Sequence, residues 1–175
     1  MNRKNILFIL VFVSISLCNL KIGWIDGQRI LDEYEDVKVV LQEVSKEENR
    51  LTLQYQDMTV ELDSLVSEYQ TRKVILTPDK VSEMEALITQ KQQELQMFVQ
   101  NVQSPQGELA AYYNSLMIPV QKRIETAVQK VAIDSSYDYI LDCSAGACPY
   151  TKEEHNLTGY VLEELKKLAL DSLDE

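Results

Sequence analysis

The sequence predicts a mostly α-helical α+β fold, in which a long antiparallel coiled-coil hairpin projects from a small β-body that also carries a C-terminal helix. Three observations predict it: two segments with heptad spacing, the turn residues Thr77-Pro78-Asp79 between them, and short strand-like segments outside them. We expect residues 36–119 to form the hairpin arm, with its tip near residue 77. Residues 19–35 and 120–175 are expected to form the β-body.

Apolar residues recur at alternating steps of four and three on both sides of the turn. This spacing gives a helix one apolar seam, which is buried when two helices pack together. In the first segment the seam positions are Val37, Leu41, Val44, Glu48, Leu51, Tyr55, Met58, Leu62, Leu65, Tyr69, Arg72 and Leu76. In the second they are Met84, Ile88, Lys91, Leu95, Phe98, Val102, Pro105, Leu109, Tyr112 and Leu116. Because only a short turn separates the segments, the two helices should pack antiparallel.

The turn residues also predict how the second helix starts. Thr77 is a suitable N-cap, Pro78 fits the first helical position, and Asp79 complements the helix dipole. We expect this helix to run to about Asp134 and to bend at Pro119. After Pro119 the apolar positions move to a face suited to packing on a body, at Val120, Ile124, Ala127, Val128 and Val131.

An interruption is expected within the second helix at Ser104-Pro105-Gln106-Gly107. Proline removes a helical hydrogen bond and glycine adds backbone freedom, so a kink or break is predicted there. Reflection about the tip places this point near Arg50 of the first helix. Pro105 and Gly107 are therefore candidate hinge residues.

Residues 1–18 are typical of a secretory signal peptide. Arg3 and Lys4 are followed by an apolar run, Ile6–Leu17, which is shorter than the roughly 20 residues of a membrane-spanning helix. We expect the chain to be exported, with cleavage near Cys18. An uncleaved membrane anchor and a lipoprotein modified at Cys18 are the alternatives.

The chain is acidic, with a formal net charge of −11. Cleavage after Cys18 removes Arg3 and Lys4 and no acid, so the mature charge becomes −13 (15 − 28). Nucleic-acid binding needs a basic surface, and anionic lipids repel an acidic protein. We therefore expect no nucleic-acid partner. The tip has a local excess of two positive charges, from Arg72, Lys73 and Lys80 against Asp79, which we interpret as a solvated turn.

Short elements of the body flank the arm. Lys21–Asp26 reads as a strand, and Asp26 is placed to cap a helix over the next five residues. Tyr137–Asp142 reads as a second strand and Cys148–Thr151 as a third, at an edge because Pro149 lacks an N–H group. Thr158 is expected to cap a final helix whose buried side is formed by Val161, Leu162, Leu165, Leu168 and Ala169.

Cys143 and Cys148 flank a four-residue turn. Two cysteines in an exported chain favour a disulfide, while free thiols and a metal site that adds His155 are alternatives. We interpret His155 as an exposed loop residue and acidic pairs such as Glu163-Glu164 as solvated helix faces. The sequence lacks a phosphate-binding glycine loop and a recognisable nucleophile motif, so we expect no enzyme activity, no cofactor and no bound metal.

Several apolar residues of the predicted arm lie outside the seam. On a solvated helix they could hold non-native segments of another protein, with methionine and tyrosine supplying adaptable contacts. The alternative is that they widen the seam or contact the body. These candidate client-contact residues are Leu53, Val60, Val66, Val74, Ile75, Met97, Val99 and Tyr113.

The order of these elements resembles the Skp (OmpH-like) family of periplasmic chaperones. The residues that carry the resemblance are Ile22–Leu31 (IGWIDGQRIL), Ile118–Ile124 (IPVQKRI), Tyr137–Asp142 (YDYILD) and Leu157–Leu162 (LTGYVL). Each segment alone has little specificity, whereas their order around a hairpin of this length is much more specific.

The resemblance implies a homotrimer whose chains pool their strands into a central β-body with three projecting arms. It further implies an ATP-independent holdase that encloses unfolded outer-membrane β-barrel proteins between the arms and prevents their aggregation. By position, the residues implied in the body and trimer contacts are Ile22, Trp24, Ile30, Tyr139 and Leu141. Members of this family are often basic, so the acidity of this chain argues against lipopolysaccharide or anionic-lipid contact. A competing interpretation is an exported or membrane-anchored coiled-coil scaffold that binds one specific folded partner.

Overall fold

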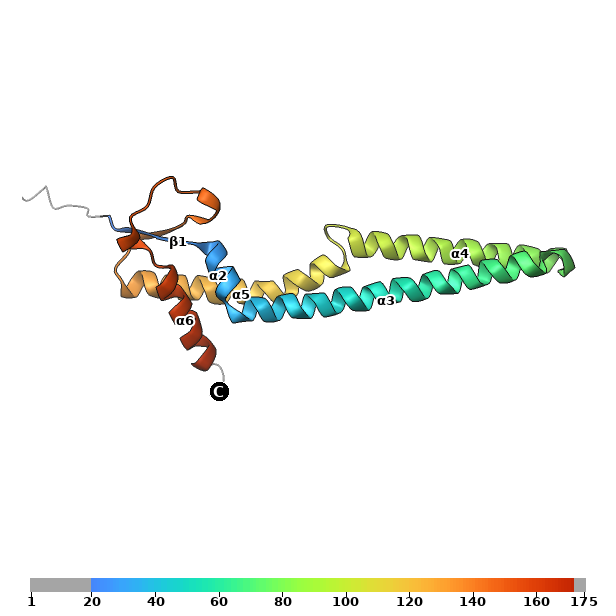
Figure 1. The fold of residues 1–175 in the computed structure, drawn as a ribbon, viewed down its shortest axis with the longest axis horizontal. Coiled ribbons are helices and arrows are strands. Elements are labelled where there is room, and N and C mark those ends of the chain that lie inside the picture. Colours follow the sequence, from blue (N-terminus) through green and yellow to red (C-terminus); the bar gives the residue numbers. More distant parts are fainter. Residues whose placement is uncertain (1–19, 172–175) are drawn as a thin grey trace, which may run out of the picture. The chain divides into compact units, whose positions relative to one another are not determined.

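The structure, a computed structural model, describes residues 20–170 in full and the backbone of Asp171. The predicted signal peptide and Cys18 lie outside the described residues. Two compact units are present. We call Tyr34–Arg123 the arm, and the described residues up to Glu33 and from Ile124 onward the body. The elements, drawn in Figure 1, are β1 Ile22–Ile25, α2 Gly27–Glu33, α3 Glu35–Arg72, η1 Lys73–Ile75, α4 Pro78–Gln103, α5 Glu108–Asp134, β2 Tyr139–Asp142, η2 Ser144–Gly146, η3 Glu153–His155 and α6 Thr158–Asp171.

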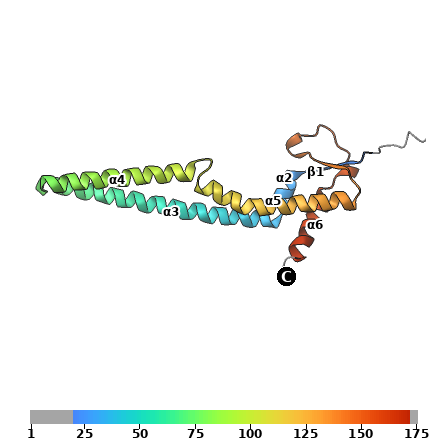
Figure 2. The ribbon, with the colours of Figure 1, turned by 180° about the vertical axis from the view of Figure 1, so that it is seen from behind.

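The predicted fold class is confirmed, since long helices dominate the chain and the one sheet among the described residues has two strands. In the arm, α3 and α4 lie side by side in both views of the ribbon (Figures 1 and 2). Most seam positions are buried or half-buried, and Leu51 is the most enclosed at 3% exposure. Five seam positions are exposed, namely Leu41, Glu48, Tyr55, Arg72 and Pro105. At the first of them Leu41 is 52% exposed, while Val40 is buried at 6%. Here a step of three from Val37, close to the 3.6-residue period, follows the buried stripe.

The tip of the hairpin forms as predicted at Thr77 and Pro78. Thr77 occupies the N-cap position with extended backbone and Pro78 is at the first helical position, but the Thr77 side chain makes no capping hydrogen bond. The positive excess expected at the tip is offset because its cations pair with nearby glutamates. These pairs are Arg72–Glu68, Lys73–Glu85 and Lys80–Glu83.

The predicted interruption of the second helix is confirmed. α4 ends at Gln103, and α5 begins at Glu108. The expected neighbour is also confirmed, because the Arg50 Nη2 atom lies 2.9 Å from the Glu108 Oε1 atom. By contrast, α5 continues without a break through Pro119 to its end at Asp134.

A small polar cluster lies where the chain enters and leaves the arm. The hydroxyl of buried Tyr34 donates to Asp36 Oδ2 at 2.6 Å, and Arg123 pairs with the same carboxylate. Burial, and then the hydrogen bond to Asp36, raise the pKa of Tyr34 to about 12. Because Asp36 belongs to α3 and Arg123 to α5, the cluster links the first and last helices of the arm.

The body contains a parallel pair of strands. β1 and β2 pair in the register Ile22↔Tyr139 to Ile25↔Asp142, so both predicted strands are confirmed. The third predicted strand, Cys148–Thr151, is wrong, because these residues are irregular. Pro149 has no N–H group for a ladder. Instead, the segment around Asn156 reaches β1: Asn156 bridges Trp24, and the next residue donates its N–H to the Trp24 carbonyl at 2.8 Å.

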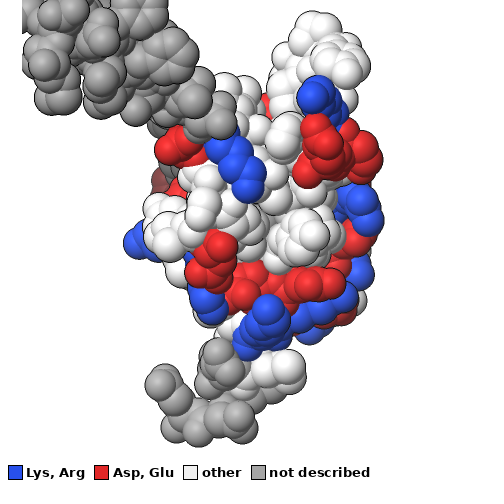
Figure 3. Space-filling model, turned by 90° about the vertical axis from the view of Figure 1, so that its left-hand side faces the viewer, with Lys and Arg blue, Asp and Glu red and all other residues white. Residues whose placement is uncertain are grey.

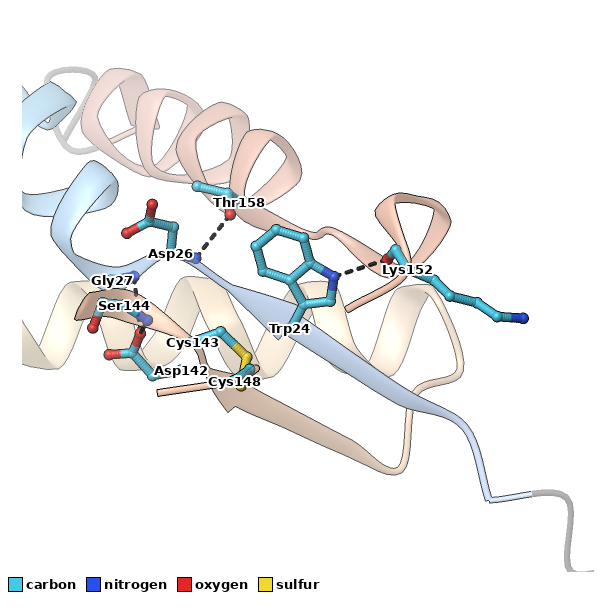
Figure 4. Close-up of a disulfide and its surroundings, with 9 residues drawn as sticks. All are labelled: Trp24, Asp26, Gly27, Asp142, Cys143, Ser144, Cys148, Lys152 and Thr158. Carbon is cyan, nitrogen blue, oxygen red and sulfur yellow. Dashed lines mark hydrogen bonds between the residues drawn. A yellow bond between two sulfur atoms is a disulfide. The ribbon is translucent and has the colours of Figure 1, made fainter. Parts of the chain in front are cut away.

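The caps of α2 and α6 connect the sheet to the helices. Asp26 caps α2 as predicted, because its Oδ1 atom accepts from the Arg29 N–H at 3.1 Å. The cap predicted for α6 is wrong: Asn156 Oδ1 accepts from the Thr158 N–H at 3.1 Å. The Thr158 hydroxyl instead connects two elements, since it accepts from the Asp26 N–H at 2.9 Å (Figure 4). The same hydroxyl donates to Asn156 Oδ1 at 2.7 Å.

Helix α6 contributes much of the hydrophobic core of the body. Its predicted buried side is confirmed at Val161, Leu162 and Leu165, while Leu168 and Ala169 are half-buried. The other buried apolar residues of this unit are Ile25, Ile30, Ala127, Val131 and Leu157. This short list shows that the core of a single chain is small.

One acidic residue that we expected on a solvated face is buried. Glu164 is 5% exposed and pairs with Lys130 of α5 and, at 3.4 Å, with Lys167 of α6. The hydrogen bond from Lys130 lowers the pKa of the Glu164 carboxyl. Its partner Lys130 is 34 residues away, so local sequence gives no signal for the pair.

Replacing a core leucine of α6 should destabilise the body far more than replacing an exposed one. Leu165 is fully buried and Leu170 is 64% exposed. Leu165→Ala should lower the free energy of unfolding by about 2–5 kcal/mol, because it leaves a cavity. Leu170→Ala should change it by about 0.5 kcal/mol or less. Urea unfolding followed by circular dichroism compares the two variants, and equal losses would contradict this packing.

Candidate functional site

The candidate sites among the described residues are surfaces of the arm and of the body. In the described residues, no group of three or more His, Cys, Asp or Glu side chains could hold a metal ion. No helix within residues 20–171 is both long and apolar enough to cross a membrane. We therefore describe three features: the exposed apolar residues of the arm, the interruption between α4 and α5, and the sheet face of the body.

The structure exposes most of the candidate client-contact residues of the arm. Val74 and Ile75 at the tip are 93% and 80% exposed, which is extreme for β-branched apolar side chains. The others that are exposed are Leu53, Val60, Met97 and Tyr113. Val66 and Val99 are only half-buried, as expected of residues that widen the seam. These side chains are thus spread along the arm and do not form one site.

An open groove lies where the chain leaves α4 and enters α5. Figure 1 shows the connecting loop turning away from α3. The groove has a volume of about 950 Å³, and we call it the break groove. Its lining residues are Val44, Glu48, Leu51, Thr52, Tyr55, Phe98, Val99, Val102, Gln103, Ser104, Pro105, Leu109, Ala110, Tyr113 and Asn114. The sequence predicted the interruption but not the groove, because the groove is formed between the interruption and the facing helix α3, and its shape depends on how the two pack.

The loop at the interruption is held by hydrogen bonds and close packing. Ser104 N–H donates to the Gln100 carbonyl at 3.1 Å, and Gly107 N–H donates to the Ser104 carbonyl at 2.9 Å. A Cβ atom at Gly107 would lie 1.9 Å from the Asn101 carbonyl oxygen, much closer than any real contact. Gly107 is therefore needed for the close approach of two backbone segments, and the flexibility that we first assigned to it is not required.

The body carries an apolar sheet face. The register pairs Ile22 with Tyr139 and Trp24 with Leu141, so these four residues share one face of the sheet. Ile22, Tyr139 and Leu141 are exposed, and Trp24 is half-buried with its indole N–H donating to the Lys152 carbonyl at 2.9 Å. Ile30 differs from them, because it is 1% exposed and belongs to the core of its own chain. On the face of the body drawn in Figure 3, acidic and basic side chains border uncharged surface.

A disulfide joins Cys143 and Cys148, just after β2. The turn between them is the short helix η2, and the hairpin that we expected is absent from these residues. Beside it, Asp142 Oδ1 accepts from the N–H groups of Gly27 at 3.0 Å and Ser144 at 2.9 Å (Figure 4). Burial opposes ionisation of Asp142, but these hydrogen bonds outweigh it and lower the pKa of the carboxyl. Closing so short a loop should stabilise the body by about 2 kcal/mol or less.

His155 is not the exposed loop residue that we expected. It ends the short helix η3, is half-buried, and its Nδ1 atom lies 3.1 Å from the Tyr137 hydroxyl. The two rings meet edge to face with their centroids 5.9 Å apart. His155 therefore joins η3 to the segment before β2, which is a structural role that its sequence neighbours did not indicate.

Together these features define a coiled-coil arm protein that presents apolar surface and has a small body. The family model described as "Outer membrane protein (OmpH-like)" matches residues 21–165. The chaperone protein Skp of Vibrio cholerae serotype O1 is 25% identical over 146 residues, which are 83% of this chain and 83% of the relative. The chain belongs to the Skp (OmpH-like) chaperone family.

A solved structure supports the same fold. The crystal structure of an OmpH-like protein from Caulobacter crescentus superposes with a TM-score of 0.73 and 16% sequence identity. The match covers 83% of each chain. At this identity the likeness concerns the fold alone, and it confirms that the helical hairpin and small sheet are a shared architecture.

A glycine pair tests the packing at the interruption. Gly107→Ala should lower the free energy of unfolding by about 1–3 kcal/mol, because the added Cβ atom collides with backbone. Gly159→Ala is the matched control: a Cβ there meets nothing within 4 Å, and alanine in a helix should stabilise by about 0.4–1 kcal/mol. Thermal unfolding followed by circular dichroism measures both, and a Gly107→Ala variant as stable as wild type would refute the close approach.

Proposed function

We propose that the mature chain is an ATP-independent periplasmic holdase that binds unfolded outer-membrane β-barrel proteins and prevents their aggregation. In this proposal three chains form a homotrimer through the body, and the client is held in a cavity between their arms. Binding needs no reaction, cofactor or metal. The interruption at Pro105 and Gly107 acts as a hinge that adapts the arms to clients of different size, because helical hydrogen bonds are lost there, while Gly107 supplies the close packing of the turn.

The observation that carries the proposal is the exposed apolar surface of the arm. Val60 and Met97, on opposite helices of the hairpin, are 67% and 61% exposed, although both are large apolar residues. An unfolded barrel protein offers many apolar side chains but no fixed surface. Scattered apolar contacts, each weak, suit such a client better than a shaped interface does.

The trimer is supported by the sheet face of the body. A two-stranded sheet is marginal by itself, and exposed Ile22, Tyr139 and Leu141 would leave apolar surface in water. Strands pooled from three chains would bury these residues, and Trp24 would contribute from its half-buried position. Ile30 supports the assembly only indirectly, by packing inside its own chain.

The acidic charge of the chain is compatible with a client that is bound through apolar contacts. Apolar contacts do not depend on cations, and the mature charge of −13 (15 − 28) keeps the apolar arms from associating with one another. The same charge disfavours anionic lipid and lipopolysaccharide. The paired cations at the tip, such as Lys73 with Glu85, leave no strong basic patch there.

Removing apolar surface from the arm should weaken holdase activity. The test variant is Leu53→Ser/Val60→Ser/Met97→Ser, and the control is Tyr160→Ser/Leu170→Ser, which removes exposed apolar surface from the body. In a light-scattering assay, a urea-unfolded barrel protein is diluted into each chaperone. The arm variant should need about tenfold more protein to suppress aggregation, because several apolar contacts are lost. The control should match wild type.

Two outcomes count against the proposal in different ways. If the arm variant protects the client as well as wild type does, these residues are not the client surface. If the wild-type protein itself fails to suppress aggregation, the holdase proposal is rejected, and a scaffold with one folded partner becomes the better account.

A further inference from the structure

We propose that the break groove is a binding site for a short extended segment of an uncharged, apolar polypeptide. This inference rests on the proposed holdase function and adds a defined site within each arm to the cavity between arms. It is carried by three observations on the groove: its lack of charge, its length and volume, and the two amide side chains in its wall.

The lining of the groove and its α4–α5 wall are nearly free of charge. From Leu95 to Gln121, 27 residues of α4, the loop and α5 contain one charged residue, Glu108, in a chain where charged residues make up 26%. That carboxylate is paired with Arg50. Among the lining residues Glu48 alone carries a charge. Glu48 would repel acidic residues of a bound segment, and the lining has no lysine or arginine to bind them.

The dimensions favour an extended chain over a helix. On α3 the lining runs from Val44 to Tyr55, a rise of on the order of 16 Å. Enclosing a helix of that length and 10 Å diameter would take roughly 1,300 Å³, so the open groove of about 950 Å³ could take up only part of it. An extended chain covers the same length with about five residues and is thinner. The helical arm of a second copy is therefore a poor occupant, and an unfolded segment is a good one.

The wall of the groove can satisfy an extended backbone. Gln103 and Asn114 line it, and neither amide side chain has a hydrogen-bond partner among residues 20–171. Each amide can donate to a carbonyl and accept from an N–H group. Apolar residues such as Phe98 and Leu109 supply contacts for alternate side chains of the segment. This combination of an apolar lining and a few amides would bind an extended peptide with little sequence specificity.

Filling the groove should abolish this binding. Ala110 lines the groove, and its neighbour Ala111 is exposed and outside it. The probe is a fluorescein-labelled ten-residue peptide of alternating valine, tyrosine and serine, measured by fluorescence anisotropy with the full mature protein. Ala110→Trp should weaken binding at least about tenfold, and Ala111→Trp should bind within about twofold of wild type. A second peptide, with glutamate in place of serine, should bind about tenfold more weakly.

A cross-linking experiment decides the case if Ala110→Trp does not fold. Tyr113 at the groove and Tyr160 on the body are each replaced by photoreactive benzoylphenylalanine. The probe peptide should cross-link at position 113 and not at position 160. Equal capture at both positions, or unchanged binding in a folded Ala110→Trp variant, overturns the groove.

The aggregation assay separates this inference from the proposed function. A wild-type protein that protects the barrel client, with a folded Ala110→Trp variant that binds the peptide normally, rejects the groove and keeps the holdase. A wild-type protein that neither protects the client nor binds the peptide rejects both.

Discussion

The apolar seam between α3 and its antiparallel partners α4 and α5 is the interaction on which the arm depends. α3 has 38 residues and extends roughly 57 Å, so few of its side chains can reach a compact core. Yet in a single chain most of the seam is only half-buried, and Leu51 is an exception. Such a seam holds two helices together while apolar atoms remain accessible along its edges. Stability would therefore depend on the seam, and client binding on its accessible edges and on the apolar residues that flank it.

At the interruption, residues 104–107, the pairing of the helices is kept while apolar surface becomes accessible. Helical hydrogen bonds are lost there, but the turn from Ser104 to Gly107 satisfies part of the backbone, and Arg50 pairs with Glu108 across the hairpin. The pairing of α3 with α4 on one side of the interruption and with α5 on the other is thus kept, while seam contacts are lost over a short length. The space left by the missing seam contacts is the break groove, whose apolar lining is available to another chain. We regard the interruption as a built feature of the arm, since Gly107 is packed and not loose.

The sequence predicted the features that arise from local chemistry. Heptad spacing indicated the helices, Thr77-Pro78 the tip, and Pro105 the interruption, because each of these signals acts within a few residues. It failed where distant segments decide the outcome. The third strand that we expected at Cys148–Thr151 does not form, whereas Asn156, further along the chain, bridges to β1. Glu164 is buried because Lys130 of another helix reaches it. The break groove was missed for the same reason, since it exists only between two helices.

The central claim, a trimer that encloses one unfolded client, is tested most directly by native mass spectrometry. The mature protein would be measured alone and after addition of one urea-unfolded outer-membrane β-barrel protein. Our account predicts a trimer that takes up a single client and keeps it soluble. A monomer or dimer that ignores the unfolded client would contradict it.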